Sequence, residues 1–253
     1  MDEYIIRLRC AYVVLVALAV VLGCIVRSSP GRWTLGNPYA DMPIGYDVSW
    51  PNCGIKPPNN MSWGIVGITG GISLRPNNCA RIEASWFKTL SLYINTGYPG
   101  GKRVWQFSSA PKDCSVYDST CLAYDYGYAE GVYAVHLATS QGLHAGVWWV
   151  DVETENSWDD DPLVNRASIQ GSIDAIRRET VFGRVGVYSY PAQWDIITGK
   201  WHPHFPAWAA TGGTKFEDAK KACAAASFTG GPLWLGQYTR GLDRNLPCTT
   251  ADF

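Results

Sequence analysis

Residues 148–155 read Trp-Trp-Val-Asp-Val-Glu-Thr-Glu, an apolar run that ends in carboxylates. Aromatic and β-branched residues favour a buried strand, and on a strand Trp149, Asp151 and Glu153 point to one face. The two acids then lie about 6–7 Å apart along the backbone, and in a partly dry cleft their proximity raises at least one pKa. The stretch predicts a strand with an acid pair at its end that is able to donate a proton. Solvated acids on a surface strand are the alternative.

The apolar, β-rich pattern recurs along the chain, with helical stretches between the strands. Strands are expected at 44–50, 63–69, 91–96, 146–153, 184–190, 207–210 and 233–239. Helices are expected at 80–90, 124–141, 163–181 and 216–225. The alternation predicts an α/β fold, a TIM-like (β/α) barrel of seven or eight strands that is irregular in its C-terminal third, where helices are short or absent.

The composition limits the kind of protein. Of the 253 residues 47% are hydrophobic and 17% charged, enough to bury the core of one large domain. A formal net charge of −1 provides no attraction for a polyanion, which argues against a nucleic-acid partner. The 12 Trp and 14 Tyr residues offer flat faces that suit sugar rings, although core packing is the competing use.

The N-terminal segment indicates export. Arg7 and Arg9 precede an uncharged apolar run over 10–26, so residues 1–27 are expected to form a signal peptide or a membrane anchor. The run is short for a spanning helix, no clear cleavage site follows it, and Cys24 lies in a weak lipoprotein box. A cleaved signal, an anchor and a lipoprotein therefore all stay open.

Domain boundaries follow from this reading. Residues 28–42, rich in Gly, Pro and Ser, are expected to be a linker, and residues 43–253 the barrel domain. We expect the domain to be monomeric and extracytoplasmic, either secreted or touching the membrane only through the N-terminal segment.

The cysteines agree with an oxidising compartment. Outside the N-terminal segment they form an even set of six, which predicts disulfides. Pairing of nearest neighbours is the expected connectivity, although spacing alone leaves other pairings open. The expected pairs are Cys53 with Cys79, Cys114 with Cys121 and Cys223 with Cys248.

No metal site or cofactor is expected. The sequence has no Cys-x-x-Cys, and its paired histidines, His202 and His204, lie in a Pro-flanked stretch typical of a solvated loop. Glu155 and the acids at 159–161 are interpreted as solvated charges, with a calcium site as a minor alternative because their spacing is not that of an EF-hand.

Residues 97–122 form a long connection that contains two of the cysteines. Loops of this length in compact domains are usually functional or cross-linked by a disulfide. A loop that follows a barrel strand lies on the catalytic face. It is expected to form a wall of a substrate groove; an insertion without function is the alternative.

Several short motifs follow one another in a characteristic order. They are Gly-Tyr-Asp-Val-Ser (45–49), Gly-Ile-Val-Gly-Ile-Thr-Gly (64–70), Asp-Val-Glu (151–153), Gln-Tyr-Thr (237–239) and Leu-Asp-Arg-Asn (242–245). In this order they resemble the glycoside hydrolase family 25 lysozymes over about residues 43–245, and the ordered set is far more specific than a lone Asp-x-Glu. The Trp-Trp-Val-Asp-Val-Glu-Thr strand also resembles an exported actinobacterial subfamily related to these lysozymes.

The resemblance implies a muramidase-like hydrolase that cleaves peptidoglycan between N-acetylmuramic acid and N-acetylglucosamine. Matched motif by motif, Glu153 is the expected general acid, Asp151 and Asp47 stabilise charge or orient the substrate, and Asp243 looks like the fourth acid of the family. Substrate contacts are expected from Asp243, Trp149, Tyr188, Gln237, Tyr238, Asn95 and Trp234.

One stretch departs from the family pattern. Lysozymes of this family often carry a Tyr-His-Phe-like sequence on the third strand, where this chain has Tyr-Ile-Asn-Thr at 93–96, followed by the long stapled loop. The wall of the substrate groove is therefore expected to differ, which leaves open a different glycan or a loss of activity. The alternative function is a catalytically silent barrel that binds cell-wall glycan or a protein partner.

Overall fold

The computed structural model describes residues 36–59, 61–100, 110–181 and 183–249. The chain divides into two compact units, residues 1–36 and 37–253, and the described helices and strands all belong to the second. The expected signal or anchor segment at 1–27 lies outside the described residues. Within the described ranges, no helix has the length and apolarity needed to cross a membrane.

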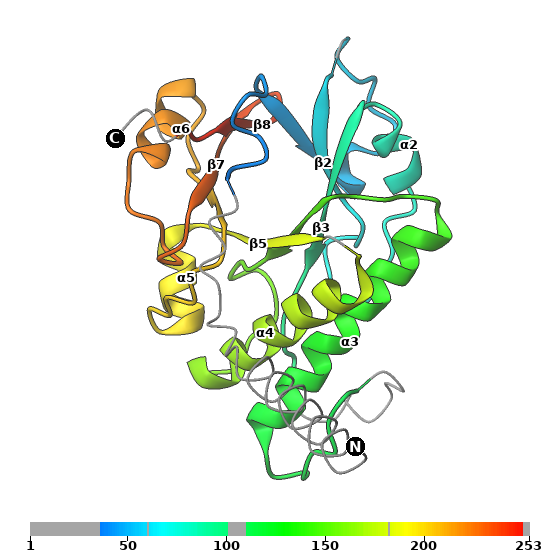
Figure 1. The fold of residues 1–253 in the computed structure, drawn as a ribbon, viewed down its shortest axis with the longest axis vertical. Helices are drawn as coiled ribbons and strands as arrows, with labels where there is room; N and C mark the ends of the chain where they lie inside the picture. The colour runs from blue at the N-terminus through cyan, green and yellow to red at the C-terminus, as the bar shows by residue number, and fades with distance from the viewer. Residues whose placement is uncertain (1–35, 60, 101–109, 182, 250–253) are drawn as a thin grey trace, which may run out of the picture. The chain divides into compact units, whose positions relative to one another are not determined.

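Eight strands close into a barrel in sequence order (Figure 1). Neighbouring strands from β1 to β7 pair in parallel, whereas β8 runs antiparallel to both β7 and β1 and closes the ring. The predicted TIM-like α/β barrel is confirmed, and its irregularity in the C-terminal third is the β7–β8 hairpin. The strands are β1 (Gly45–Val48), β2 (Trp63–Gly67), β3 (Thr89–Asn95), β4 (Val147–Asp151), β5 (Arg184–Ser189), β6 (Ala207–Ala210), β7 (Leu233–Arg240) and β8 (Leu242–Pro247).

Helices cover the outside of the barrel unevenly. The two longest, α3 and α4, pack against each other, and glycines allow the close approach: a Cβ on Gly127 of α3 would lie 1.9 Å from the carbonyl oxygen of Ser168. The described helical segments are the 3₁₀ turn η1 (Trp50–Asn52), α2 (Ala80–Ala84), α3 (Ser119–Ser140), α4 (Pro162–Glu179), α5 (Pro191–Thr198) and α6 (Phe216–Cys223).

Two predicted helix boundaries are wrong. The helix expected at 80–90 ends at Ala84, and Thr89 and Leu90 instead pair with β2, because the sheet satisfies their backbone groups. Helix α3 begins five residues before the expected start at 124, since the carboxylate of Asp118 accepts a hydrogen bond from the Cys121 amide and caps it.

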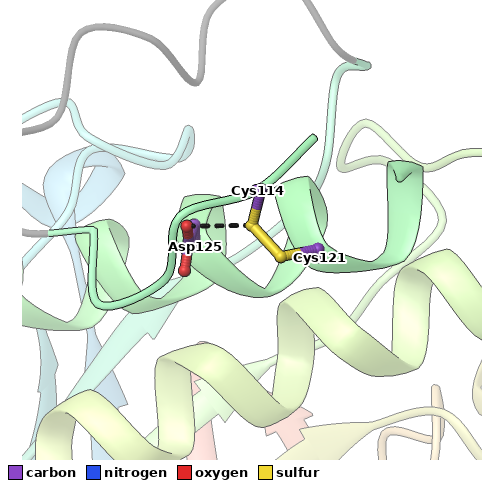
Figure 2. A group of neighbouring side chains, drawn as sticks. All are labelled: Cys114, Cys121 and Asp125. Atoms are coloured by element: carbon purple, nitrogen blue, oxygen red, sulfur yellow. Dashed lines mark hydrogen bonds between the residues drawn. A yellow bond between two sulfur atoms is a disulfide. The ribbon is translucent and has the colours of Figure 1, made fainter. Parts of the chain in front are cut away.

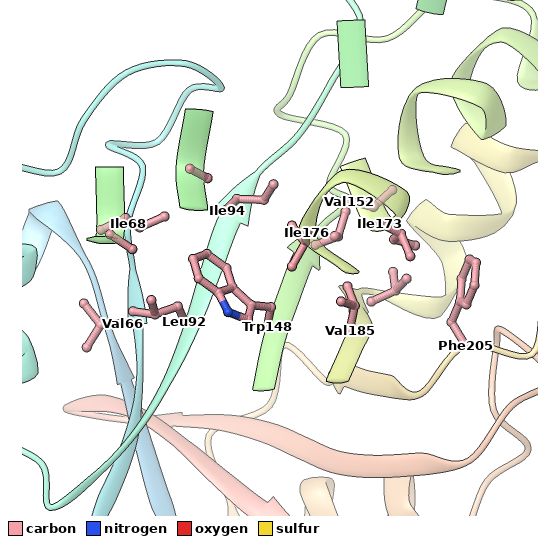
Figure 3. Close-up of a cluster of buried hydrophobic side chains, with 14 of the residues drawn as sticks. Val66, Ile68, Leu92, Ile94, Trp148, Val152, Ile173, Ile176, Val185 and Phe205 are labelled. Atoms are coloured by element: carbon pink, nitrogen blue, oxygen red, sulfur yellow. The ribbon is translucent and has the colours of Figure 1, made fainter. Parts of the chain in front are cut away.

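The buried side chains form two main layers. One fills the barrel interior and includes Trp63, Trp149, Trp208 and Trp234. The rings of Trp208 and Trp234 each meet that of Trp149 edge to face. The other separates the strands from the surrounding helices, and Figure 3 shows part of it. Its members include Val66, Ile68, Leu92, Ile94, Trp148, Val150, Val152, Ile173 and Ile176.

The alternation along β4 is as predicted. Trp149 and Asp151 face the barrel interior, while Val150 and Val152 lie in the layer beneath the helices. Because side chains on a strand alternate in this way, Glu153, two residues beyond Asp151, is directed back over the barrel opening.

The compact unit begins before the expected boundary at 43. The amide of Asn37 donates to the carbonyl oxygens of Trp234 and Cys248, at 2.8 Å each. Tyr39 is buried in the barrel interior, where its hydroxyl bonds to Ser91 and accepts from the Trp149 indole. Residues 37–42 of the expected linker therefore belong to the barrel.

All three expected disulfides are present, namely Cys53–Cys79, Cys114–Cys121 and Cys223–Cys248. The first joins the turn after β1 to the start of α2, and the third joins the end of α6 to the residue after β8. Such cross-links stabilise a fold chiefly by restricting the unfolded chain.

Candidate active site

A cavity of about 230 Å³ opens at the C-terminal ends of the parallel strands. In barrels of this kind the loops that follow the strands build the active site on this face. Four carboxyl side chains reach the cavity from β1, β4, the residues after β4, and β8. The lining residues are Asp47, Val48, Ser49, Pro51, Asn52, Tyr93, Asp151, Glu153, Tyr188, Trp208, Gln237 and Asp243.

Asp47 is held by amide side chains from the hairpin that closes the barrel. Gln237 of β7 donates to both carboxylate oxygens at 3.1 Å, and Asn245 of β8 donates to Oδ2 at 2.8 Å. The Tyr188 hydroxyl donates to the Gln237 carbonyl oxygen at 2.8 Å, which orients that amide. Burial, and then the charge of Asp243, raises the pKa of Asp47 to about 7 despite these hydrogen bonds.

Asp151 also lines the cavity but is almost fully buried, at 3% exposure. Asn95 of β3 donates to its Oδ2 at 2.5 Å. The Asn95 amide is itself oriented, because its carbonyl oxygen accepts from the Thr69 hydroxyl at 3.0 Å and the Gly71 backbone at 3.1 Å. Burial, followed by the charge of Glu153, raises the pKa of Asp151 well above its ordinary value.

Glu153 is partly exposed on the cavity wall. Burial, then the charge of Glu155, raises its pKa to about 7, and a hydrogen bond from Asp151 acts in the opposite direction. The pKa of Asp151 is raised well above its ordinary value and that of Glu153 to about 7, so Glu153 is the member of the coupled pair placed to exchange a proton near neutral pH. A carboxyl that exchanges a proton at this pH suits general acid catalysis.

Asp243 reaches the cavity from β8. It lies directly opposite Asp47 in the antiparallel β1–β8 pair, and residues opposite one another in a sheet share a face. The Thr239 hydroxyl donates to Asp243 at 2.6 Å and holds its carboxylate on the rim. The structure thus brings together all four acids singled out in the sequence.

The other expected substrate residues divide into two groups. Tyr188 and Gln237 line the cavity, whereas Trp149 and Trp234 are fully buried in the barrel interior and leave no ring face for a sugar. Tyr238 points to the opposite face of β7, where it packs against Phe216. These three rings are core residues, which corrects the expectation that they contact substrate.

Asn95 also has a different place from the one expected. It is 8% exposed and its amide is occupied by Asp151, Thr69 and Gly71. The side chain orients Asp151 and is not among the residues that line the cavity.

Sequence reasoning missed several residues around the acids. Asn245 bonds to Asp47, and Tyr93, Trp208 and the segment 49–52 line the cavity. Asn245 was within reach of sequence reasoning, because it lies two residues after Asp243 and so shares its face on a strand. The position of residues 49–52 depends on the turn η1. The sequence predicted a strand up to residue 50 and no turn there.

A larger cavity, about 500 Å³, lies between β6 and α6. Alanines and glycines make up half of its lining, and Asp218 and Lys221 are its charged members. The larger cavity has no group of converging acids, so the smaller cavity is the candidate for chemistry.

The described residues contain a group with the donor atoms of a metal site, Cys114, Cys121 and Asp125 (Figure 2). Its two cysteines are joined in a disulfide and so offer no thiolate. Cys114 Sγ lies 3.2 Å from Asp125 Oδ2. A disulfide sulfur carries no hydrogen and donates none to the carboxyl group, so the two atoms are in close contact; burial raises the pKa of Asp125. The group is a structural contact at the start of α3.

The fold is similar to those of a solved lysozyme, a muramidase and an endolysin domain. The bacterial lysozyme from Streptomyces coelicolor matches with a TM-score of 0.50 and 16% identity, covering 82% of this chain and 93% of that one. A muramidase from Trichobolus zukalii has a TM-score of 0.47 and 12% identity, covering 83% and 95%. The catalytic domain of a Listeria phage P40 endolysin has a TM-score of 0.44 and 14% identity, covering 83% and 94%. No family model and no curated protein matches the sequence. At these identities the likeness concerns the fold.

Proposed function

We propose that the protein is a glycoside hydrolase that cleaves the glycan strands of peptidoglycan outside the cytoplasmic membrane. The observation that carries the proposal is the convergence of Asp47, Asp151, Glu153 and Asp243 on one open cavity at the catalytic face of the barrel. The fold shared with a bacterial lysozyme supports the substrate class, and the disulfides support an oxidising compartment.

In the proposed reaction Glu153 donates its proton to the oxygen of the bond that breaks. As the leaving group departs, positive charge develops at the anomeric carbon, and the carboxylate of Asp47 stabilises it. Addition of a water molecule to that carbon, with loss of the water's proton to a carboxylate of the site, completes the hydrolysis. The carboxylate left on Glu153 accepts the hydrogen bond from Asp151, which retains its own proton. Glu153 and Asp47 both have a pKa of about 7, so the active form, with the proton on Glu153, is most populated near neutral pH.

The test is release of new reducing ends from purified peptidoglycan by the full chain with its disulfides intact. Borohydride reduction of the products identifies the sugar at the new end and so distinguishes a muramidase from a glucosaminidase. We expect Glu153→Gln to lower the rate by about 100-fold or more. Asp195→Asn, which removes an exposed acid on α5, serves as the matched control and should keep the wild-type rate.

One result would overturn the proposal, and another would overturn only the assignment of Glu153. If the wild-type protein binds peptidoglycan but releases no reducing ends, the silent glycan-binding barrel is the correct function. If Glu153→Gln cleaves as fast as the wild type, the barrel is a hydrolase but Glu153 is not its acid.

A further inference from the structure

An exposed tryptophan lies next to the acid cavity. Trp50, in the turn η1, is 53% exposed, although tryptophan is normally a highly buried residue. Its neighbours in the chain, Ser49 and Pro51, both line the cavity, as does Asn52. The ring is thus continuous with the cavity rim without being part of the cavity itself.

The position of the ring is constrained by the structure around it. Its indole nitrogen lies so close to Gly71 that a Cβ there would be 2.6 Å away, and Gly71 has a φ of +77°, which a side chain would strain. The pyrrole edge therefore rests on the turn after β2, and the exposed area belongs to the rest of the ring.

The turn that carries Trp50 is also held in place. The Asn52 side chain accepts a hydrogen bond from the Ser49 amide at 2.9 Å, and the adjacent Cys53 is linked to Cys79 at the start of α2. A large apolar surface that is ordered before binding loses little conformational entropy when a ligand covers it.

The size of the cavity indicates what such a surface is for. At about 230 Å³ it is smaller than the roughly 300–1,000 Å³ pockets that enclose drug-sized ligands, so it holds about one sugar ring. A polymeric glycan must continue across the rim. The apolar face of a pyranose ring matches the flat face of an indole. Ile72, which follows Gly71 in the chain, is a further exposed apolar residue, at 57%.

We propose that Trp50 is the platform of a second glycan subsite, on which a pyranose ring next to the one in the acid cavity stacks. The inference rests on the proposed function for the kind of ligand. In this proposal, η1 and the Gly70–Gly71 turn recognise the length of the glycan. This region is separate from the four acids.

The test measures binding of β-1,4-linked N-acetylglucosamine oligomers of two to six rings to the full chain carrying Glu153→Gln, which prevents turnover. By isothermal titration calorimetry, we expect affinity to increase by about tenfold once the oligomer is long enough to reach Trp50. Adding Trp50→Ala should abolish that increase, and Trp50→Phe should restore most of it. Tyr117→Ala removes an aromatic ring that is 95% exposed and does not line the cavity, and should change nothing.

An unchanged dependence on length with Trp50→Ala, or no binding of the six-ring oligomer, overturns the inference. Circular dichroism establishes that the Trp50→Ala protein is folded, which its exposure leads us to expect. Failure of the proposed function has a different signature. If the wild type releases no reducing ends while the length dependence still requires Trp50, the platform stands and hydrolysis does not.

Discussion

Replacing Glu153 by Gln should stabilise the fold at alkaline pH while removing activity. The pKa of Glu153 is about 7, against an ordinary value of 4.5, mainly because the side chain is buried. One pKa unit corresponds to about 1.4 kcal/mol, so ionised Glu153 costs the folded state up to ~3 kcal/mol. Because the side chain is partly exposed and its titration is coupled to Asp151, we expect about half of this, ~1.5 kcal/mol.

The direction of the pH dependence follows from the raised pKa. The folded protein binds this proton more tightly than the unfolded chain does, so the contribution of Glu153 to stability is full below about pH 4.5 and is lost as the pH rises through about 7. An amide stays neutral throughout. Glu153→Gln should therefore match the wild type at pH 4 and exceed it at pH 8.

Urea unfolding at pH 4 and pH 8, followed by far-UV circular dichroism with the disulfides intact, gives the two free energies of unfolding. Asp195→Asn, at an exposed position, should show no such difference between the two pH values. The reasoning is refuted if the difference between Glu153→Gln and the wild type is the same at both pH values. The reasoning is also refuted if the variant is less stable than the wild type at pH 8.

Three further changes test other parts of the site and the fold. Glu155→Gln removes a charge that raises the pKa of Glu153, so the alkaline limb of kcat/KM should move to lower pH by about half a unit; an unmoved limb contradicts this. Asn95→Ala should lower kcat by about tenfold with KM nearly unchanged, because it releases Asp151 from its hydrogen bond without touching the cavity lining; a change in KM alone would contradict a positioning role. Replacing Cys53 and Cys79 together by Ser should lower the free energy of unfolding by about 3 kcal/mol in urea, since their disulfide closes a loop with a sequence separation of 26.

The fold was predictable because its signals are local and repeated. The strand at 207–210 was predicted with its observed bounds, and the alternation along β4 placed Asp151 and Glu153 on one face. Strand β8 was not predicted as a strand, because its sequence Leu-Asp-Arg-Asn-Leu-Pro contains residues that disfavour strands. It forms because both of its edges are paired, with β7 and with β1, a tertiary effect that no local pattern reports.

The site was predictable in its acids and less so in its aromatics. Gln237 and Tyr238 are adjacent on β7, so strand alternation alone could have excluded one of them from the cavity. Trp149 shows a different limit. It shares a face with Asp151, but it lies one step further down the barrel, where interior side chains pack against one another. Periodicity reports the face of a side chain and not its depth.

The register of β8 decides the chemistry of the cavity. Asp243 is paired with Asp47, so the two carboxylates share a face, and the charge of Asp243 contributes to the raised pKa of both Asp47 and Glu153. A slip of one residue would exchange Asp243 for Leu242 or Arg244 and turn Asn245 away from Asp47. An arginine at that place would favour the ionised form of Asp47 and lower its pKa. The same hairpin that interrupts the regular barrel thus supplies the negative charge that keeps a proton available at neutral pH.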